Sequence, residues 1–193
     1  MKIELIFLTI SPRLWYYLLV RGGCITFKIN DIVVHTHSGI FIIDDIILMD
    51  CGVGNQRYYS LKSYLSLDHN SSLVVYVPES KSEELLRYLI SKDEAVDLLS
   101  SFSEIETEWD ENIKDRKKRF SELLCSKNII DSCIVLKSLY ERQRILEKNN
   151  KNLKIIDIDF FKKSRLKVLG ELSIVLECSE EEIEQKLLAE ILL

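Results

Sequence analysis

The sequence predicts an α+β protein in which a small β domain is followed by an all-helical domain. Between Phe27 and Pro78, short segments rich in β-branched and aromatic residues alternate with turn signals, which is typical of strands. After Pro78 the apolar residues recur with the 3.6-residue period of helices. The chain has 193 residues, of which 47% are hydrophobic and 30% charged, so it is long enough and apolar enough for two small folded domains.

Four segments of the β domain carry the strand pattern: DIVVHT (31–36), GIFIIDDIIL (39–48), QRYYSLK (56–62) and SLVVYVP (72–78). Turn signals separate them, namely HSG, DCGVGN and LDHNSS. We expect four or five short antiparallel strands. A flat sheet of this size buries too little apolar surface, so these strands predict a small barrel or a strongly bent sheet.

The second half of the chain predicts six helices, at 82–90, 93–102, 109–126, 128–148, 157–176 and 179–192. Two of them begin with a capping box, Ser91-x-x-Glu94 and Ser179-x-x-Glu182. The asparagine-rich EKNNKN at 147–152 predicts a loop, because asparagine tolerates turn conformations.

We therefore divide the chain into an N-terminal extension (1–24), a β domain (25–80), a helical linker (81–104) and a helical domain (105–193). The apolar start of the extension is similar to a signal peptide or a membrane anchor. However, Pro12 and Arg13 interrupt its apolar run, and no small-residue cleavage site follows. We expect a disordered or loosely packed extension, with a signal peptide, a membrane anchor or a start codon placed too far upstream as the alternatives.

Charge is segregated along the helical half. The net charge of the whole chain is −5. Residues 113–176 nevertheless contain 16 Lys/Arg against 8 Asp/Glu, a local net of +8, and an acidic run precedes them at 104–111. A basic surface with acidic flanks is able to bind phosphates although the chain is acidic overall. The alternative is an ordinary solvated helix surface.

Trp109 stands where the charge changes sign, in EIETEWDENIKDRKKRF (104–120). We expect this ring to face outward and to contact DNA, because an aromatic wedge is able to occupy a distorted base step in the minor groove. The cations that we expect to hold phosphate are Arg116, Lys117, Lys118, Arg119 and Arg142. The alternative is that Trp109 packs between helices and covers the domain junction, since tryptophans are mostly buried.

Little in the sequence indicates catalysis. His35 and His37 form an H-x-H pair on a strand, but no D-H pair completes a metal site, and the only other histidine, His69, lies in a loop. GVG at 52–54 lacks the helix with Lys-Ser/Thr that a phosphate loop requires. The five cysteines contain no C-x-x-C pair, which favours reduced thiols in a cytoplasm. We expect no enzyme activity, no metal and no cofactor.

Seven segments follow one another in an order that is specific although none is a sharp motif. They are FKINDIVVHTHSGIFIIDDI, RYYSLK, LVVYVP, ISKDEAVDLL, EWDENIKDRKKRFSELLCSKN, IVLKSLYERQRIL and VLGELSIVLECSEEEIE. In this series, over about residues 25–187, the chain resembles the CarD family of bacterial transcription regulators.

The resemblance implies that residues 25–80 form a Tudor-like domain, which is a small SH3-like barrel that binds the β subunit of RNA polymerase. It implies that the helical domain lies on promoter DNA at the upstream edge of the melted region and stabilises the open complex. Trp109 matches the family's tryptophan that wedges into the minor groove. Asn30 stands where the family often has glycine, so we expect a left-handed backbone there.

The polymerase contacts implied by the resemblance depart from the family pattern. Some members place arginines on the polymerase-facing strands, and the matching positions here are Met49 and Tyr76. We expect an apolar rather than an ionic interface, formed by Met49, Val75, Tyr76, Val77 and Pro78.

These observations predict a cytoplasmic, nucleoid-associated transcription regulator. Its expected partners are the RNA polymerase β subunit and promoter DNA, bound at the bubble edge with weak sequence preference by a monomer. The main alternative is a protein–protein adaptor that joins two proteins without contacting DNA. A second alternative is a metal-dependent hydrolase that uses His35 and His37.

Overall fold

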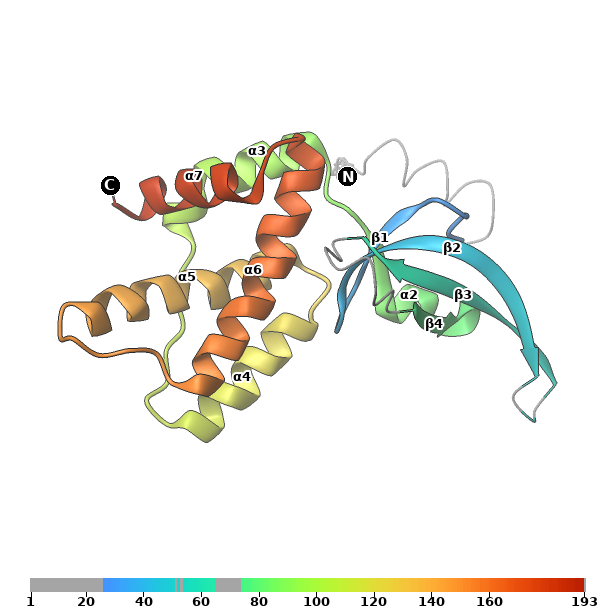
Figure 1. The fold of residues 1–193 in the computed structure, drawn as a ribbon, viewed down its shortest axis with the longest axis horizontal. Helices are drawn as coiled ribbons and strands as arrows, with labels where there is room; N and C mark the ends of the chain where they lie inside the picture. Colours follow the sequence, from blue (N-terminus) through green and yellow to red (C-terminus); the bar gives the residue numbers. More distant parts are fainter. Residues whose placement is uncertain (1–25, 51, 53, 65–73, 193) are drawn as a thin grey trace, which may run out of the picture.

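The fold is α+β, as the sequence predicts. A computed structural model describes residues 26–50, 52, 54–64 and 74–192. One side of the molecule is a sheet and the other is a group of helices, with α6 (Ile155–Leu176) next to the sheet (Figure 1). The predicted extension 1–24 and His69 lie outside the described residues.

The sheet has five antiparallel strands, β1 (Ile32–His35), β2 (Gly39–Asp50), β3 (Asn55–Ser63), β4 (Val74–Pro78) and β5 (Leu86–Tyr88). Their order is β4-β3-β2-β1-β5. Among the described residues β4 and β5 do not pair with each other, so the sheet is open. Figure 1 shows β2 and β3 as a long curved ribbon that extends away from the helices. The bent sheet is therefore present, whereas a closed barrel is not.

A bulge divides the β2–β3 ribbon into two parts. Ile43 pairs with Leu61 and Asp45 pairs with Ser60, which leaves Asp44 as an extra residue in β2. Before the bulge, β2 contributes to the core of the sheet, whose buried members are Phe27, Val33, Phe41, Ile43, Tyr59, Leu61, Val77 and Leu86. After the bulge, the apolar side chains of β2 are only partly covered, and Leu48 is 68% exposed.

The helix predicted at 82–90 is wrong for most of its length, because the segment contains the fifth strand, β5. Only Ser82–Leu85 is helical (α2), and Leu86 then adopts an extended backbone. The next residues pair with β1, with Arg87 opposite Val34 and Tyr88 opposite Val33. The helical period of this segment is real, but the free edge of β1 offers backbone partners that a short helix lacks. The predicted linker 81–104 thus contributes a strand to the sheet.

The other predicted helices are present with shifted ends, as α3 (Lys92–Ser100), α4 (Ile113–Cys125), α5 (Ile129–Glu147), α6 (Ile155–Leu176) and α7 (Glu180–Leu192). Both predicted capping boxes form: the Glu94 backbone N–H donates to the Ser91 side chain, and that of Glu182 donates to the Ser179 side chain. Positive φ at Asn30 (71°) and Asn150 (52°) confirms that these asparagines take the left-handed backbone.

The largest shift is at the beginning of α4, which was expected at residue 109. The helix begins at Ile113, because the Asn112 side chain accepts a hydrogen bond from the Lys114 backbone N–H and caps it. Trp109 therefore precedes the helix and lies in an extended connection after the short 3₁₀ turn Phe102–Glu104.

Helix α6 also joins the two halves of the molecule. Its Lys167 is buried, and the ammonium donates hydrogen bonds to the Thr36 carbonyl, beside the sheet, and to the Leu124 carbonyl of α4. Leu166 lies against Gly39 at the beginning of β2. The β domain is thus fixed to the helical domain at the end of the sheet from which the β2–β3 ribbon points away.

Candidate nucleic-acid interface

The connection between Phe102–Glu104 and α4 is held firmly against α5. The buried ammonium of Lys137 donates to the carbonyls of Ser103 and Ile105, at 2.6 Å each. The Glu108 backbone N–H donates to the Ser138 hydroxyl at 2.9 Å. These bonds fix the backbone on the N-terminal side of Trp109, so the indole is mounted on a rigid support.

Trp109 is partly buried, which corrects the expectation of a ring that faces outward. Its ring packs edge-on against the buried Phe120, with centroids 6.2 Å apart. Two guanidinium groups lie against the ring, Arg116 at 4.2 Å and Arg142 at 4.9 Å from its centroid. The indole Nε1 is buried and has no hydrogen-bond partner within the described residues. We name Trp109, Phe120, Arg116 and Arg142 the tryptophan seat.

Arg116 has a structural position and is not available to DNA phosphate, which corrects its predicted role. Its side chain is only 3% exposed. It forms a two-pronged ion pair with the buried Asp157 of α6, at 3.0 Å for each bond, and also donates to the Asp110 carbonyl. A buried arginine needs these acceptors, because an unpaired buried charge is costly. Arg116 thus joins α4 to α6 and supports the Trp109 ring.

Arg119 and Arg142 are accessible, but each is paired with a carboxylate of the acidic run. Arg119 donates from Nε and NH2 to the two Glu108 carboxylate oxygens, at 2.6 and 2.7 Å. This contact lowers the pKa of Glu108. Arg142 lies 3.2 Å from Glu111. No role was predicted for Glu108 or Glu111 from the sequence, although both stand just before the basic helix.

Three lysines of α4 form the accessible part of the cationic surface. Lys114, Lys117 and Lys118 are exposed, and within the described part of the chain they form no ion pair. Their i, i+3 and i+4 spacing places them on neighbouring positions of one helix surface. We name these three residues the lysine row. Lys117 and Lys118 keep the accessible position that a phosphate contact requires.

The five expected polymerase contacts divide between the two faces of the sheet. Val77 is 1% exposed and belongs to the core, and Val75 packs against that core, so both are removed from the predicted interface. Because alternate residues point to opposite faces, Tyr76 and Pro78 lie on the other face, and Tyr76 is 51% exposed.

Cross-strand register extends this face across three strands. Pro78 pairs with Tyr58, which pairs with Ile47, and Met49 lies two residues further along β2. We name Ile47, Met49, Tyr58, Tyr76 and Pro78 the outer sheet face. It is apolar and aromatic, and three of the five expected contacts belong to it.

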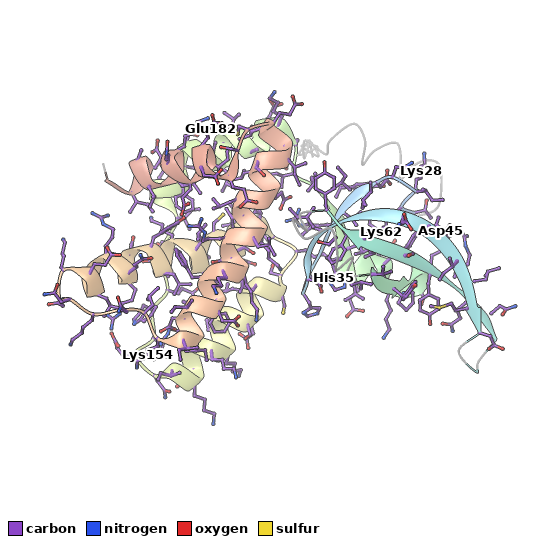
Figure 2. The ribbon with its side chains drawn as sticks, viewed as in Figure 1. Lys28, His35, Asp45, Lys62, Lys154 and Glu182 are labelled. Atoms are coloured by element: carbon purple, nitrogen blue, oxygen red, sulfur yellow. The ribbon has the colours of Figure 1, made fainter. Side chains whose placement is uncertain are left out.

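The H-x-H pair does not form a joint ligand set. His35 is buried and His37 is exposed, and the His37 backbone N–H donates to Nδ1 of His35. Burial lowers the pKa of His35. His37 instead faces the Cys125 thiol, with Nδ1 and Sγ 3.1 Å apart. Figure 2 shows His35 at the part of the sheet that is near the helices. In the residues that the structure places, no three His, Cys, Asp or Glu side chains gather in a metal-binding group.

No model of a known protein family matches the chain, and no curated protein is found that is similar to it. Within the described residues no helix is both long and apolar enough to cross a bilayer. The features of the chain that bear on its function are therefore its ordered series of segments and the geometry of the tryptophan seat, the lysine row and the outer sheet face.

Proposed function

We propose that this chain is a transcription regulator of the CarD type, which binds RNA polymerase with its sheet and promoter DNA with its helical domain. The single observation that carries the proposal is that α4 bears the lysine row on its exposed surface and also supplies Arg116 and Phe120 to the tryptophan seat. A partly exposed aromatic ring and unpaired cations carried by one helix and the connection before it are the combination that a minor-groove contact at a distorted duplex needs.

The tryptophan seat supports a DNA contact in which only the exposed part of the Trp109 ring takes part. The buried Arg116 and Phe120 orient the ring, while its remaining exposed part is the surface that a parted base step can meet. The lysine row holds the adjacent phosphates. Because phosphate contacts position a protein without reading sequence, we expect weak sequence preference and a steep dependence on salt.

The outer sheet face is the proposed polymerase-binding surface, in the Tudor-like role that the resemblance implies. Its side chains are apolar and aromatic, and β4 is an edge strand whose other side has no partner strand among the described residues. An edge strand of this kind is able to accept a further strand from a partner. The sheet then locates the protein on polymerase, and the helical domain contacts the DNA nearby.

The proposed activity is stabilisation of the melted promoter. A protein that binds the open complex more tightly than the closed complex shifts the population toward the open state by that difference in affinity. The same effect represses a promoter whose slow step is escape. The direction of regulation therefore depends on the promoter and not on the protein's contacts.

The adaptor is the second candidate, and the partial burial of Trp109 is the observation that favours it. Trp109→Ala separates the two functions. A regulator keeps polymerase binding and loses open-complex lifetime, whereas an adaptor loses a protein partner or its folded structure and leaves promoter complexes unchanged. Trp109→Phe is the packing control, because it keeps an aromatic ring in the seat.

The lysine row gives a direct test of DNA contact. Lys117→Gln with Lys118→Gln is expected to weaken binding to a forked promoter duplex and to lower the salt dependence of that binding. The matched control is Lys92→Gln with Lys186→Gln, which removes the same charge from exposed positions on α3 and α7, far from α4 (Figure 1). Equal weakening by both pairs contradicts a specific interface.

A further inference from the structure

Two carboxylates of one short segment are paired with two arginines from different helices. Glu108 holds Arg119 of α4 in a two-pronged contact, and Glu111 holds Arg142 of α5. Trp109 lies between these carboxylates in the chain, and the guanidinium of Arg142 also lies against its ring. The segment is therefore connected to both α4 and α5 at Trp109.

We propose that Glu108 and Glu111 occupy the phosphate-binding positions of Arg119 and Arg142 in the DNA-free protein, so that DNA must displace them. This inference rests on the proposed function and describes how the same site is regulated. We name the two ion pairs the carboxylate clasp.

The chemistry of the contact makes the competition direct. A carboxylate and a phosphate diester both offer two oxygens to the planar fork of a guanidinium. Glu108 already accepts from Nε and NH2 of Arg119, so a phosphate that binds this fork must replace it. Arg142 is 27% exposed and its partner Glu111 is 74% exposed, which leaves the second pair open to the same exchange.

The exposure of both pairs makes the clasp reversible. The side chains of Arg119 and Glu108 are 50% and 37% exposed, and exposed ion pairs contribute little net free energy because water and salt screen them. By contrast, the Arg116–Asp157 pair in the same region is buried and remains in place. The surface thus separates into a fixed support and two arginines that are able to change partners.

Displacement of the clasp also uncovers part of the indole, because the guanidinium of Arg142 lies against its ring. Breaking both pairs leaves the backbone of the connection attached through the Lys137 bonds, the Glu108 N–H and the Asp110 carbonyl, but it allows Arg142 to leave the ring. The lysine row, which has no carboxylate to displace, makes the first contact with DNA. Exchange at the arginines follows and increases the exposure of the ring at the place where the duplex is parted.

The test uses the full chain with Glu108→Gln and Glu111→Gln together. These substitutions keep side-chain size and remove the competing charges. We expect affinity for a forked promoter duplex to rise about five- to tenfold at low salt, because DNA no longer has to displace the two carboxylates, while the slope of log K against log salt stays the same, since both proteins make the same phosphate contacts. Circular dichroism checks that the variants are folded.

Glu104→Gln with Glu106→Gln is the matched control. These two residues belong to the same acidic run, are exposed, and have no ion-pair partner within the described residues. If the clasp competes with DNA, this control pair gains clearly less affinity than the Glu108→Gln, Glu111→Gln variant. Equal gains for both pairs mean that net charge alone acts, and they overturn the inference.

A second measurement needs no DNA and separates failure of the clasp from failure of the proposed function. In a Trp15→Phe background, Trp109 is the only tryptophan, and acrylamide quenching reports its accessibility. We expect stronger quenching in the Glu108→Gln, Glu111→Gln variant than in the control. Unchanged quenching overturns the clasp even if DNA binds. If quenching is stronger but no variant binds DNA, the proposed function is wrong. The clasp then has no DNA contact to regulate.

Discussion

Arg87 of β5 forms a two-pronged ion pair with Glu171 of α6, with bonds of 2.5 and 2.6 Å. Glu171 is 0% exposed and also accepts a hydrogen bond from the Ile90 backbone N–H at 3.0 Å. This pair connects the last strand of the sheet to the central helix of the other domain. Together with Lys167, it sets the position of the outer sheet face relative to the lysine row.

Removing one partner of this pair is expected to destabilise the whole chain. Arg87→Met leaves the Glu171 carboxylate buried without its cation, which costs about 3–5 kcal/mol. The double variant Arg87→Met, Glu171→Met removes both charges and is expected to recover most of this loss. Urea unfolding measures both free energies. The control is Lys62→Met, which removes an exposed pair with Asp44 and should cost less than about 1 kcal/mol. A double variant as unstable as the single one contradicts this account.

The buried Lys167, which connects the two domains, also predicts a dependence of stability on pH. Burial lowers the pKa of Lys167 from 10.5 to about 8, with Arg87, Glu171 and Cys125 as the nearby charged or titratable groups. Above pH 8 the folded chain releases this proton while the unfolded chain keeps it until about pH 10.5. Stability contributed by Lys167 therefore rises with pH, by about 1 kcal/mol between pH 8 and 9.

Lys167→Met is expected to remove this rise, and the slope of unfolding free energy against pH is the quantity to measure. The window ends near pH 9, because the raised pKa of the buried Cys133 acts in the opposite direction above that value. Lys163→Met, at an exposed position of the same helix, is the control and should keep the slope. A wild-type chain whose stability falls between pH 8 and 9 contradicts the prediction.

Substitution of Arg116 is expected to lower stability far more than substitution of Lys117 or Lys118. Arg116→Met leaves Asp157 buried without a partner and should lower the free energy of unfolding by about 3 kcal/mol. Lys117→Gln and Lys118→Gln lie on the exposed side of α4 and should change it by no more than about 0.5 kcal/mol. Thermal or urea unfolding distinguishes them. If Arg116→Met is as stable as the wild type, the buried pair does not have the supporting role given to it here.

Tyr76 and Val77 are adjacent but point to opposite faces of β4. Val77→Ala removes apolar volume from the core and should cost about 2 kcal/mol in stability, with polymerase binding retained in the folded fraction. Tyr76→Ala should leave stability almost unchanged and weaken binding to purified polymerase. Unfolding and a pull-down on the same two proteins provide the comparison. Loss of binding by Val77→Ala alone contradicts the outer sheet face as the docking surface.

Local sequence patterns were sufficient for most of the helical domain. The capping boxes at Ser91 and Ser179 and the long apolar periods of α5 and α6 predict these helices correctly, because caps and amphipathic stripes act over a few neighbouring residues. The segment 82–90 shows the limit of such patterns. Its period is helical, yet residues 86–88 pair with β1, which is distant in the sequence.

The candidate site was likewise predictable from the sequence only where it depends on neighbouring residues. The sequence predicts one functional region at Trp109 and the basic helix, and the structure packs Trp109 against Arg116 and Phe120 of that helix. It did not identify Asp157, which lies 41 residues from Arg116 and buries that arginine. The acidic run beside Trp109 was a visible signal, but its pairing with Arg119 and Arg142 depends on how α4 and α5 pack.

The chain's own order of residues determined its two-part α+β plan, its capped helices and the sharp change of charge at Trp109, since these are local properties of backbone and side chain. Only the tertiary structure decided which cations remain unpaired and which are paired with carboxylates, and which side of β4 belongs to the core. Those outcomes depend on contacts between segments distant in sequence, and a charge or an aromatic ring acquires its accessibility only when its neighbours in space are fixed.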